Sequence, residues 1–228
     1  MIFLHGWGGD VRSFLFVAKN LGVSATLVDF YGFGKTPHPD YPLTVKDYAE
    51  GVIETMDAAG IAKADIVGHS FGGRVAIYLA AYYPERVNKL VLVDSAGVKP
   101  RRGIKYYFRI TLHKILKKFG GGLKGSDDYR ALSPVMQATF RNVVNYDETP
   151  LLGKISAETA IFWGENDTDT PIYMAKKLNK KIPDSFLFVL TNAGHFSYLD
   201  NSGSFLKILS AFIYGNAVDN NNAVYDDT

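Results

Sequence analysis

Short apolar runs recur along the chain, and longer stretches that are apolar on only one face lie between most of them. Apolar runs without polar alternation are typical of strands buried on both faces of a parallel sheet. The strands predicted in this way cover residues 2–4, 25–28, 64–67, 89–94, 159–163 and 185–190. The intervening stretches predict helices at 13–21, 43–60, 71–83, 172–179 and 205–214.

The stretch 43–60 carries the clearest helical pattern. Its apolar residues lie on one stripe at the helical period: Val45, Tyr48, Ala49, Val52, Ile53, Met56 and Ala59. Thr44 is placed to cap the helix and Asp47 follows three residues later, which is a variant of the capping-box spacing. Gly60 is expected to end the helix.

Strands and helices that alternate in this way predict an α/β fold with a doubly wound, mainly parallel sheet. Its core is expected to consist of residues 1–95 and 154–214. The alternation stops over residues 96–153, a stretch too long for a plain crossover, so we predict a helical cap inserted into the core. Residues 215–228 are rich in Asn and Asp and are expected to form a flexible tail.

The predicted cap contains an aromatic and basic stretch. Tyr106 and Tyr107 are expected to help enclose an apolar group of the substrate. The basic residues that would suit an acidic substrate or a lipid are Arg101, Arg102, Lys105 and Arg109. The alternative interpretation is a solvated outer face whose aromatic side chains pack on the sheet.

The composition limits the classes of function. The chain has 228 residues, 47% of them hydrophobic, which is enough for one domain with a substantial core. A net charge of +2 gives no strong field for nucleic acid, and the absence of cysteine excludes disulfides and thiolate metal sites. No apolar run is long enough to span a membrane, and the residues before His5 are too few for a signal peptide. We therefore expect a soluble, cytoplasmic protein.

The most informative stretch is IVGHSFGG at residues 66–73, an apolar strand that runs into GxSxG and then into a helical pattern. A serine on so tight a turn has a strained backbone, which exposes its hydroxyl above the sheet edge. Ser70 is therefore the candidate nucleophile. The turn requires glycine at positions 68 and 72, because a Cβ at either position would collide with the neighbouring strand or helix.

A second glycine-rich loop, HGWGG at residues 5–9, follows the first strand. Such a loop can direct backbone amides into a cleft, so the N–H groups of Trp7 and Phe71 are the candidate donors to an oxyanion. An ordinary strand-to-helix turn is the alternative. The residues next to these turns are expected to line the substrate site: His5, Gly6, His69 and Phe196.

A serine nucleophile needs a base, and that base needs a carboxylate to orient it. His195 follows the last predicted strand, whose carboxyl end lies at the same sheet edge as Ser70, and it is the candidate base. Two aspartates end predicted strands. Asp167 is favoured as the carboxylate because its loop directly precedes the strand that leads to His195, and Asp94 is the alternative.

Four motifs in this order resemble the α/β-hydrolase family: HGWGG, GHSFGG, WGENDTDTP at residues 163–171 and NAGHF at residues 192–196. The resemblance covers residues 2–214. It implies the roles already considered: nucleophile Ser70, acid Asp167, base His195, and oxyanion amides of Trp7 and Phe71. The serine argues against the dehalogenase branch, which places an aspartate at the elbow.

The resemblance implies a serine hydrolase of small to medium carboxylic esters that needs no cofactor or metal. Members with this elbow and a helical cap also cleave carbon–carbon bonds in vinylogous diketones, remove N-terminal residues, or eliminate pyruvate in menaquinone synthesis. A non-catalytic receptor for a small signalling molecule is a further alternative, because such relatives can retain the triad.

The chain departs from the family pattern at its beginning. Family members usually carry additional strands before the HG loop, whereas here Met1 lies at the start of the strand that leads to His5. The strand at 25–28 is then expected to form an uncovered edge of the sheet, and exposed edges pair with other chains. We therefore expect either further residues upstream or a homodimer through that edge.

Overall fold

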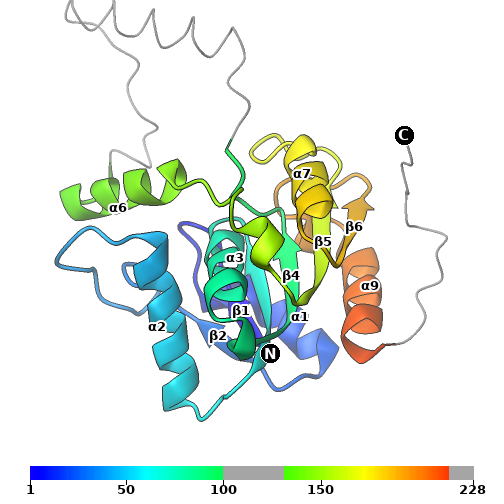
Figure 1. Cartoon of the computed structure of the whole chain (residues 1–228), viewed down its shortest axis with the longest axis horizontal. Helices are drawn as coiled ribbons and strands as arrows, with labels where there is room; N and C mark the ends of the chain where they lie inside the picture. The colour runs from blue at the N-terminus through cyan, green and yellow to red at the C-terminus, as the bar shows by residue number, and fades with distance from the viewer. Residues whose placement is uncertain (100–130, 216–228) are drawn as a thin grey trace, which may run out of the picture.

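The computed structural model describes residues 1–99 and 131–215. A six-stranded sheet with the order β2-β1-β3-β4-β5-β6 forms its centre, and every neighbouring pair of strands is parallel (Figure 1). The strands are β1 (Ile2–Leu4), β2 (Thr26–Val28), β3 (Ala64–His69), β4 (Val87–Val93), β5 (Glu158–Gly164) and β6 (Ser185–Leu190). The predicted α/β fold with a doubly wound parallel sheet is confirmed.

The strand order reverses at β1, because the chain moves from β1 to β2 on one side and then returns to place β3 on the other. In doubly wound sheets, ligands bind outside the carboxyl ends of the strands at such a switch point. The loop after β1 is HGWGG and the turn after β3 contains Ser70. The topology therefore brings the two glycine-rich motifs to one place.

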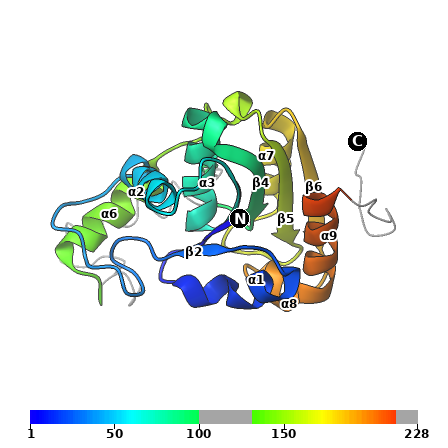
Figure 2. The same ribbon diagram turned by 90° about the horizontal axis from the view of Figure 1, so that it is seen from below.

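Helices cover both faces of the sheet (Figure 2). One face packs against α2 (Val45–Ala58), α3 (Phe71–Tyr82) and α7 (Tyr173–Lys181). The other packs against α1 (Leu15–Leu21), the one-turn α8 (Ser197–Asp200) and α9 (Ser202–Tyr214). Successive strand residues alternate between these two cores: Ile2 and Leu4 pack on the first, and Phe3 on the second.

The helix predicted at 43–60 is α2, and its predicted capping box is present. The Asp47 carboxylate accepts a hydrogen bond from Thr44 N at 2.7 Å, while Asp47 N donates to Thr44 Oγ1 at 3.4 Å. The helix predicted from residue 13 is instead a 3-10 turn, η1 (Val11–Phe14), followed by α1. Asp10 caps this turn by accepting from Arg12 N, and that local bond competes with a continuous α-helix.

The described part of the predicted cap contains one α-helix, α6 (Pro134–Asn145), with Ser133 as its N-cap. This helix is tied to the loop before α2, because Leu43 N donates to Thr139 Oγ1 at 3.0 Å and Asn142 Nδ2 donates to Leu43 O at 3.2 Å. Phe140 places its ring 5.1 Å from that of Trp7, so α6 reaches the HGWGG loop. The bounds predicted for the cap and the tail stay predictions.

A buried ion pair lies where the cap sequence returns to the core. Arg74 on α3 donates from Nη1 to Tyr146 O at 2.6 Å, and the same atom lies 3.5 Å from the Glu148 carboxylate. Glu148 N in turn donates to Gly97 O at 3.0 Å. Burial raises the pKa of Glu148 well above its ordinary value although Arg74 opposes the shift. The pair holds the two stems of the insert against the helix that follows Ser70.

β2 forms one edge of the sheet, as expected for the strand predicted at 25–28, and β6 forms the other. Dimerisation through the β2 edge stays a prediction.

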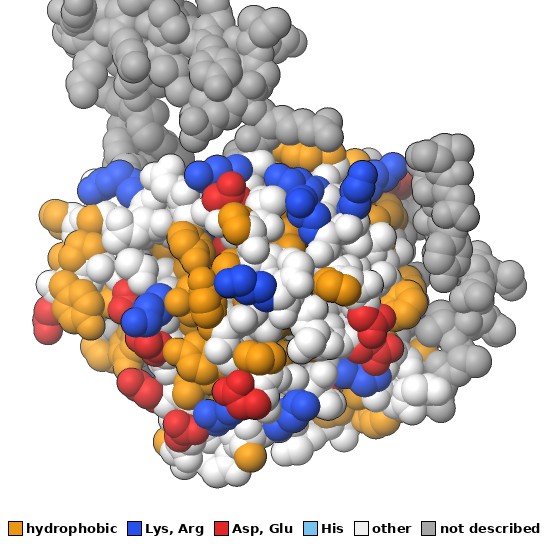
Figure 3. Space-filling view, in the orientation of Figure 1, with side chains coloured by type: hydrophobic (Ala, Val, Ile, Leu, Met, Phe, Trp, Pro, Cys, Tyr) orange, Lys and Arg blue, Asp and Glu red, His pale blue; other side chains and the backbone are white. Residues whose placement is uncertain are grey.

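No helix within residues 1–99 and 131–215 is both long and apolar enough to cross a bilayer. On the face shown in Figure 3, acidic and basic side chains are interspersed among apolar ones.

We expect Gly72→Ala to lower the free energy of unfolding by about 3 kcal/mol, because the new Cβ would collide with the backbone carbonyl of Leu4 in β1. The matched control is Gly203→Ala in α9, where a Cβ meets open space and where alanine favours the helix by up to about 1 kcal/mol. Urea unfolding of both variants measures the difference. Equal stabilities would contradict the close packing of α3 on β1.

Candidate active site

Ser70 lies on the sharp turn between β3 and α3, with φ 51° and ψ −108°. A positive φ is strained for a residue with a side chain, and the surrounding backbone keeps it there. Ser70 N donates to Val93 O at 3.0 Å, and Ser70 O accepts from Ala96 N at 3.0 Å. A Cβ at Gly68 would collide with Gly72 O, so the glycines permit the tight turn as the sequence predicted.

The turn after β6 brings His195 to Ser70, although 125 residues separate them in the sequence. His195 Nε2 lies 2.9 Å from Ser70 Oγ, and His195 Nδ1 lies 2.9 Å from Asp167 Oδ2. The arrangement that satisfies both contacts has Nδ1–H donating to the carboxylate and Ser70 Oγ–H donating to Nε2. The three side chains predicted from the sequence therefore form one continuous hydrogen-bonded chain.

Asp167 is held rigidly in the loop after β5. Its Oδ1 accepts from Asp169 N at 2.8 Å and from Thr170 N at 2.9 Å, while its Oδ2 accepts from Thr170 Oγ1 at 2.6 Å. Burial by itself raises the pKa of this carboxyl, but the hydrogen bonds from His195 and Thr170 outweigh it and keep the pKa below its ordinary value. Asp167 therefore stays ionised beside the imidazole.

The environment of His195 favours its protonated form more than water does. Burial lowers the pKa of the imidazole, yet the hydrogen bond and the charge of Asp167 more than compensate, so the pKa lies above its ordinary value. A raised pKa makes the ring a stronger base towards a hydroxyl proton. The pair is suited to accept a proton from Ser70.

Asp94, the alternative carboxylate, contacts neither nitrogen of His195. It is fully buried, with Oδ1 accepting from Gly164 N at 2.8 Å and Oδ2 accepting from Ser197 N at 3.0 Å. Burial raises its pKa to about 7 despite these bonds. Asp94 thus joins the end of β5 to the segment after His195, and the geometry favours Asp167 as the partner of the imidazole.

The HGWGG loop lies directly beside Ser70, because a Cβ at Gly6 would come within 3.5 Å of Ser70 Cβ. Within the described residues, neither Trp7 N–H nor Phe71 N–H donates to a protein acceptor. Free backbone amides next to a nucleophile are what an oxyanion requires. The position of this loop supports the predicted pair of donors.

The other predicted lining residues differ in their exposure. His5 is buried and braces the loop, with Nδ1 2.8 Å from Gly6 O and Phe30 N donating to Nε2 at 3.2 Å. His69 is also buried, and its Nε2 lies 2.7 Å from His195 O. Phe196 is half exposed beside the His195 ring. Tyr106 and Tyr107, with the basic residues around them, lie outside the described residues.

Aromatic side chains gather on the Trp7 side of the site. The Trp7 ring contacts the rings of Phe33, Phe71 and Phe140 at centroid distances of 4.9, 5.3 and 5.1 Å. These rings come from the loop after β2, from α3 and from α6. Phe33 and Phe71 are buried, whereas Trp7 and Phe140 are partly exposed, so this side of the HGWGG loop packs against an apolar cluster.

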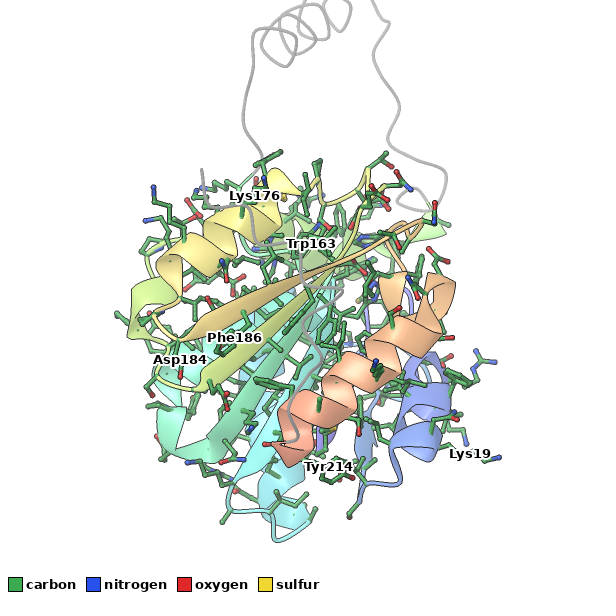
Figure 4. The ribbon with its side chains drawn as sticks, turned by 90° about the vertical axis from the view of Figure 1, so that its right-hand side faces the viewer. Lys19, Trp163, Lys176, Asp184, Phe186 and Tyr214 are labelled. Carbon is green, nitrogen blue, oxygen red and sulfur yellow. The ribbon has the colours of Figure 1, made fainter. Side chains whose placement is uncertain are left out.

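Two residues that support the site were not found from the sequence. Thr170 binds Asp167 as described above, and its Oγ1 also lies 3.2 Å from Asp94 O. Trp163, at the end of β5 and labelled in Figure 4, is fully buried and donates from Nε1 to Thr170 O at 2.6 Å. The only signal in the sequence was the position of Thr170 three residues after an aspartate, a spacing at which side chains bond to the local backbone.

Within the described residues, no group of three or more His, Cys, Asp or Glu side chains is placed to hold a metal ion. The chemistry described so far requires only the side chains and amides of the site. The absence of a cofactor stays a prediction.

Comparison with known proteins identifies the family to which the chain is similar. Residues 1–206 match the profile described as Alpha/beta hydrolase family. A 2-hydroxy-6-oxo-6-phenylhexa-2,4-dienoate hydrolase from Burkholderia cepacia is 28% identical, with 93% of this chain and 87% of the relative aligned. A pimeloyl-[acyl-carrier protein] methyl ester esterase from Neisseria meningitidis is also 28% identical, over 93% of this chain and 92% of the relative.

Solved structures show the same fold. A serine hydrolase from Cycloclasticus zankles superposes with a TM-score of 0.75 at 22% identity, covering 96% of this chain and 90% of the other. A meta-cleavage product hydrolase from Pseudomonas fluorescens gives a TM-score of 0.73 at 22% identity, covering 95% and 90%. At this identity the likeness concerns the fold alone.

Proposed function

Because the chain belongs to the α/β-hydrolase family and is a hydrolase, we propose that it is a serine hydrolase of carboxylic esters with small to medium acyl groups. The observation that supports this most directly is the chain of hydrogen bonds from Ser70 Oγ through His195 to Asp167, with both distances to the imidazole at 2.9 Å. A hydroxyl, a base and an orienting carboxylate in this order are the parts that acyl transfer to serine requires.

In the proposed reaction, Ser70 Oγ attacks the carbonyl carbon of the ester while its proton passes to His195 Nε2. The negative charge that develops on the carbonyl oxygen is stabilised by the N–H groups of Trp7 and Phe71. His195 then gives the proton to the alkoxide leaving group as the carbon–oxygen bond breaks. Water then loses a proton to the same nitrogen and attacks the acyl carbon. The imidazolium gives that proton to Ser70 Oγ as the bond between the acyl carbon and Oγ breaks, which releases the acid.

Asp167 makes this proton transfer favourable without becoming protonated. Its carboxylate fixes His195 with Nδ1–H towards itself and the basic Nε2 towards Ser70, and it stabilises the imidazolium when that forms. The partly exposed rings of Trp7 and Phe140, which pack together with the buried Phe33, favour an apolar acyl or alcohol group on that side.

A fluorophosphonate probe followed by mass spectrometry tests the proposal, together with turnover of p-nitrophenyl esters of increasing acyl length. We expect covalent labelling at Ser70 and turnover of the shorter esters. Absence of both would contradict the proposal and favour a receptor that only binds a small molecule.

Carbon–carbon bond hydrolysis is the second candidate, because the Burkholderia cepacia relative is named as a hydrolase of a phenyl-substituted oxodienoate. With His195 as the base, Ser70 Oγ can also attack a ketone carbonyl, and a carbanion is then the leaving group. A vinylogous diketone acid, assayed beside the esters, distinguishes the two. Aminopeptidase and lyase activities are tested in the same panel with a proline amide and with pyruvate detection.

The pH dependence of kcat/KM reports the base. Activity requires neutral His195, so kcat/KM is expected to rise with pH. It should reach half its plateau above pH 6.5, because Asp167 raises the pKa of His195 in the substrate-free enzyme above this ordinary value. Measuring kcat/KM for one ester from pH 5 to pH 9 gives the midpoint. A midpoint well below 6.5 would mean that Asp167 does not support the base.

A further inference from the structure

His69 is the last residue of β3 and directly precedes Ser70. Its side chain contacts the main chain at His195. The imidazole is buried, with 2% of the residue exposed. Its Nε2 lies 2.7 Å from the main-chain oxygen of His195, which is 126 residues away in the sequence. Because a carbonyl oxygen only accepts, Nε2 carries the proton and donates it to His195 O.

The His69 ring lies where three loops of the site meet. A Cβ at Gly6 would come within 2.9 Å of His69 Nδ1, so the glycine of the HGWGG loop leaves room for the imidazole. On the other side, ring centroids of His195, Phe196 and Tyr198 lie 5.1, 5.1 and 5.2 Å from that of His69. The imidazole therefore lies between the HGWGG loop and the loop that contains His195, and it fixes the spacing of these two loops.

The main chain on both sides of His195 is anchored: Ala193 O accepts from Asn166 N at 2.8 Å, and Phe196 O accepts from Leu199 N at 2.8 Å. Gly194 N donates to the Asp200 carboxylate at 2.8 Å, and Ser197 N donates to Asp94 at 3.0 Å. Within the described residues, His69 is the partner of the His195 carbonyl. Without that bond, the residue carrying the base would be held only through its neighbours and through its own ring.

His69 is also electrically suited to this place. Burial lowers its pKa to about 3, so it is neutral wherever His195 acts as a base, although the charges of His5, His195 and Asp167 also act on it. A neutral N–H donor does not repel the imidazolium that forms on His195, whereas a lysine or arginine would. The ring holds the base without opposing its protonation.

We propose that His69 is a positioning residue whose Nε2–H holds the His195 carbonyl, so that the base keeps its place between Ser70 and Asp167. The proposal rests on the proposed role of His195 in ester hydrolysis. The sequence suggested that His69 contacts the substrate. The proposal gives it a different function, which is to position the base. Loss of the bond leaves the catalytic groups present but misaligned, and misplacement by about 1 Å is enough to cost on the order of 100-fold in rate.

The test compares His69→Gln with His69→Asn. Glutamine places its amide N–H at the reach of Nε2, whereas asparagine places it at the reach of Nδ1, too short for His195 O. We expect the glutamine variant to keep kcat within about threefold and the asparagine variant to lose about 10- to 100-fold in kcat with little change in KM. Rates are normalised by fluorophosphonate titration, so that only folded sites are counted.

The pH dependence of kcat/KM is a second measurement. A residue that only stabilised the fold would leave its midpoint unchanged. In the asparagine variant the contact between His195 and Asp167 weakens, so the midpoint of kcat/KM is expected to fall towards pH 6.5, and glutamine should restore it. If both variants equal the parent in titrated kcat and midpoint, or if both raise only KM, the positioning role is wrong. A parent enzyme that neither labels nor turns over esters would instead contradict the proposed function.

Discussion

Replacing Ser70 by alanine is expected to remove ester hydrolysis almost completely, with a loss in kcat on the order of 10⁶-fold. The Ser70 hydroxyl oxygen lies 2.9 Å from His195 Nε2, and without it the base has no nucleophile to deprotonate. What remains is the contribution of the oxyanion amides and of substrate binding. The measurement is p-nitrophenyl ester turnover together with fluorophosphonate labelling, which should also be lost.

The matched control is Ser24→Ala, since Ser24 is exposed and it is the main-chain oxygen of Ser24, which the substitution keeps, that accepts from the Met1 amino group. It should retain parental activity and labelling. Circular dichroism should show that Ser70→Ala keeps its fold, because alanine fits the space of serine at the same backbone angles. Parental turnover by purified Ser70→Ala would end the proposal of a serine mechanism.

Asp167→Asn is expected to lower kcat by about 10⁴-fold at neutral pH. The geometry of the loop can persist, because the asparagine oxygen can still accept from the Thr170 amide or hydroxyl. An amide nitrogen facing His195 would donate to Nδ1, however, and would drive the ring proton to Nε2. The imidazole would then present a donor to Ser70 and could not accept its proton.

Asp94→Asn is the matched comparison, because Asp94 is the other carboxylate that ends a strand near His195. Both of its oxygens accept from backbone N–H groups, so an amide nitrogen would face one of these donors and cost about 1–3 kcal/mol of stability. Its effect on kcat, measured per titrated site, should be far smaller than that of Asp167→Asn. The reverse order would assign the acid to Asp94.

The comparison has a structural basis in how the two carboxylates are linked. The Thr170 hydroxyl donates to Asp167 and its oxygen lies 3.2 Å from Asp94 O, while the Trp163 indole donates to the Thr170 carbonyl. The acid loop is therefore tied to the end of β4 as well as to its own strand. This explains how a polar loop at the surface can hold a carboxylate steadily behind an imidazole.

The sequence by itself determined the sheet, and it placed the proposed site at one edge of that sheet. Uninterrupted apolar runs identified the six strands, and their alternation with helices fixed a parallel sheet whose loops share one edge. Ser70 could be proposed as the nucleophile because a serine on a tight turn needs glycines at fixed neighbouring positions, and His195 as the base because it follows the last strand. Both signals are local, so they are visible in one stretch of chain.

Only the tertiary structure decided which distant groups meet. Asp94 and Asp167 both end strands, and the sequence could only rank them; their hydrogen-bond partners separated them. Likewise, nothing near His69 in the sequence indicated that it would reach the carbonyl of His195 instead of the substrate. The physical reason is that a hydrogen bond depends on positions accurate to a few tenths of an ångström, which the packing of several elements sets together.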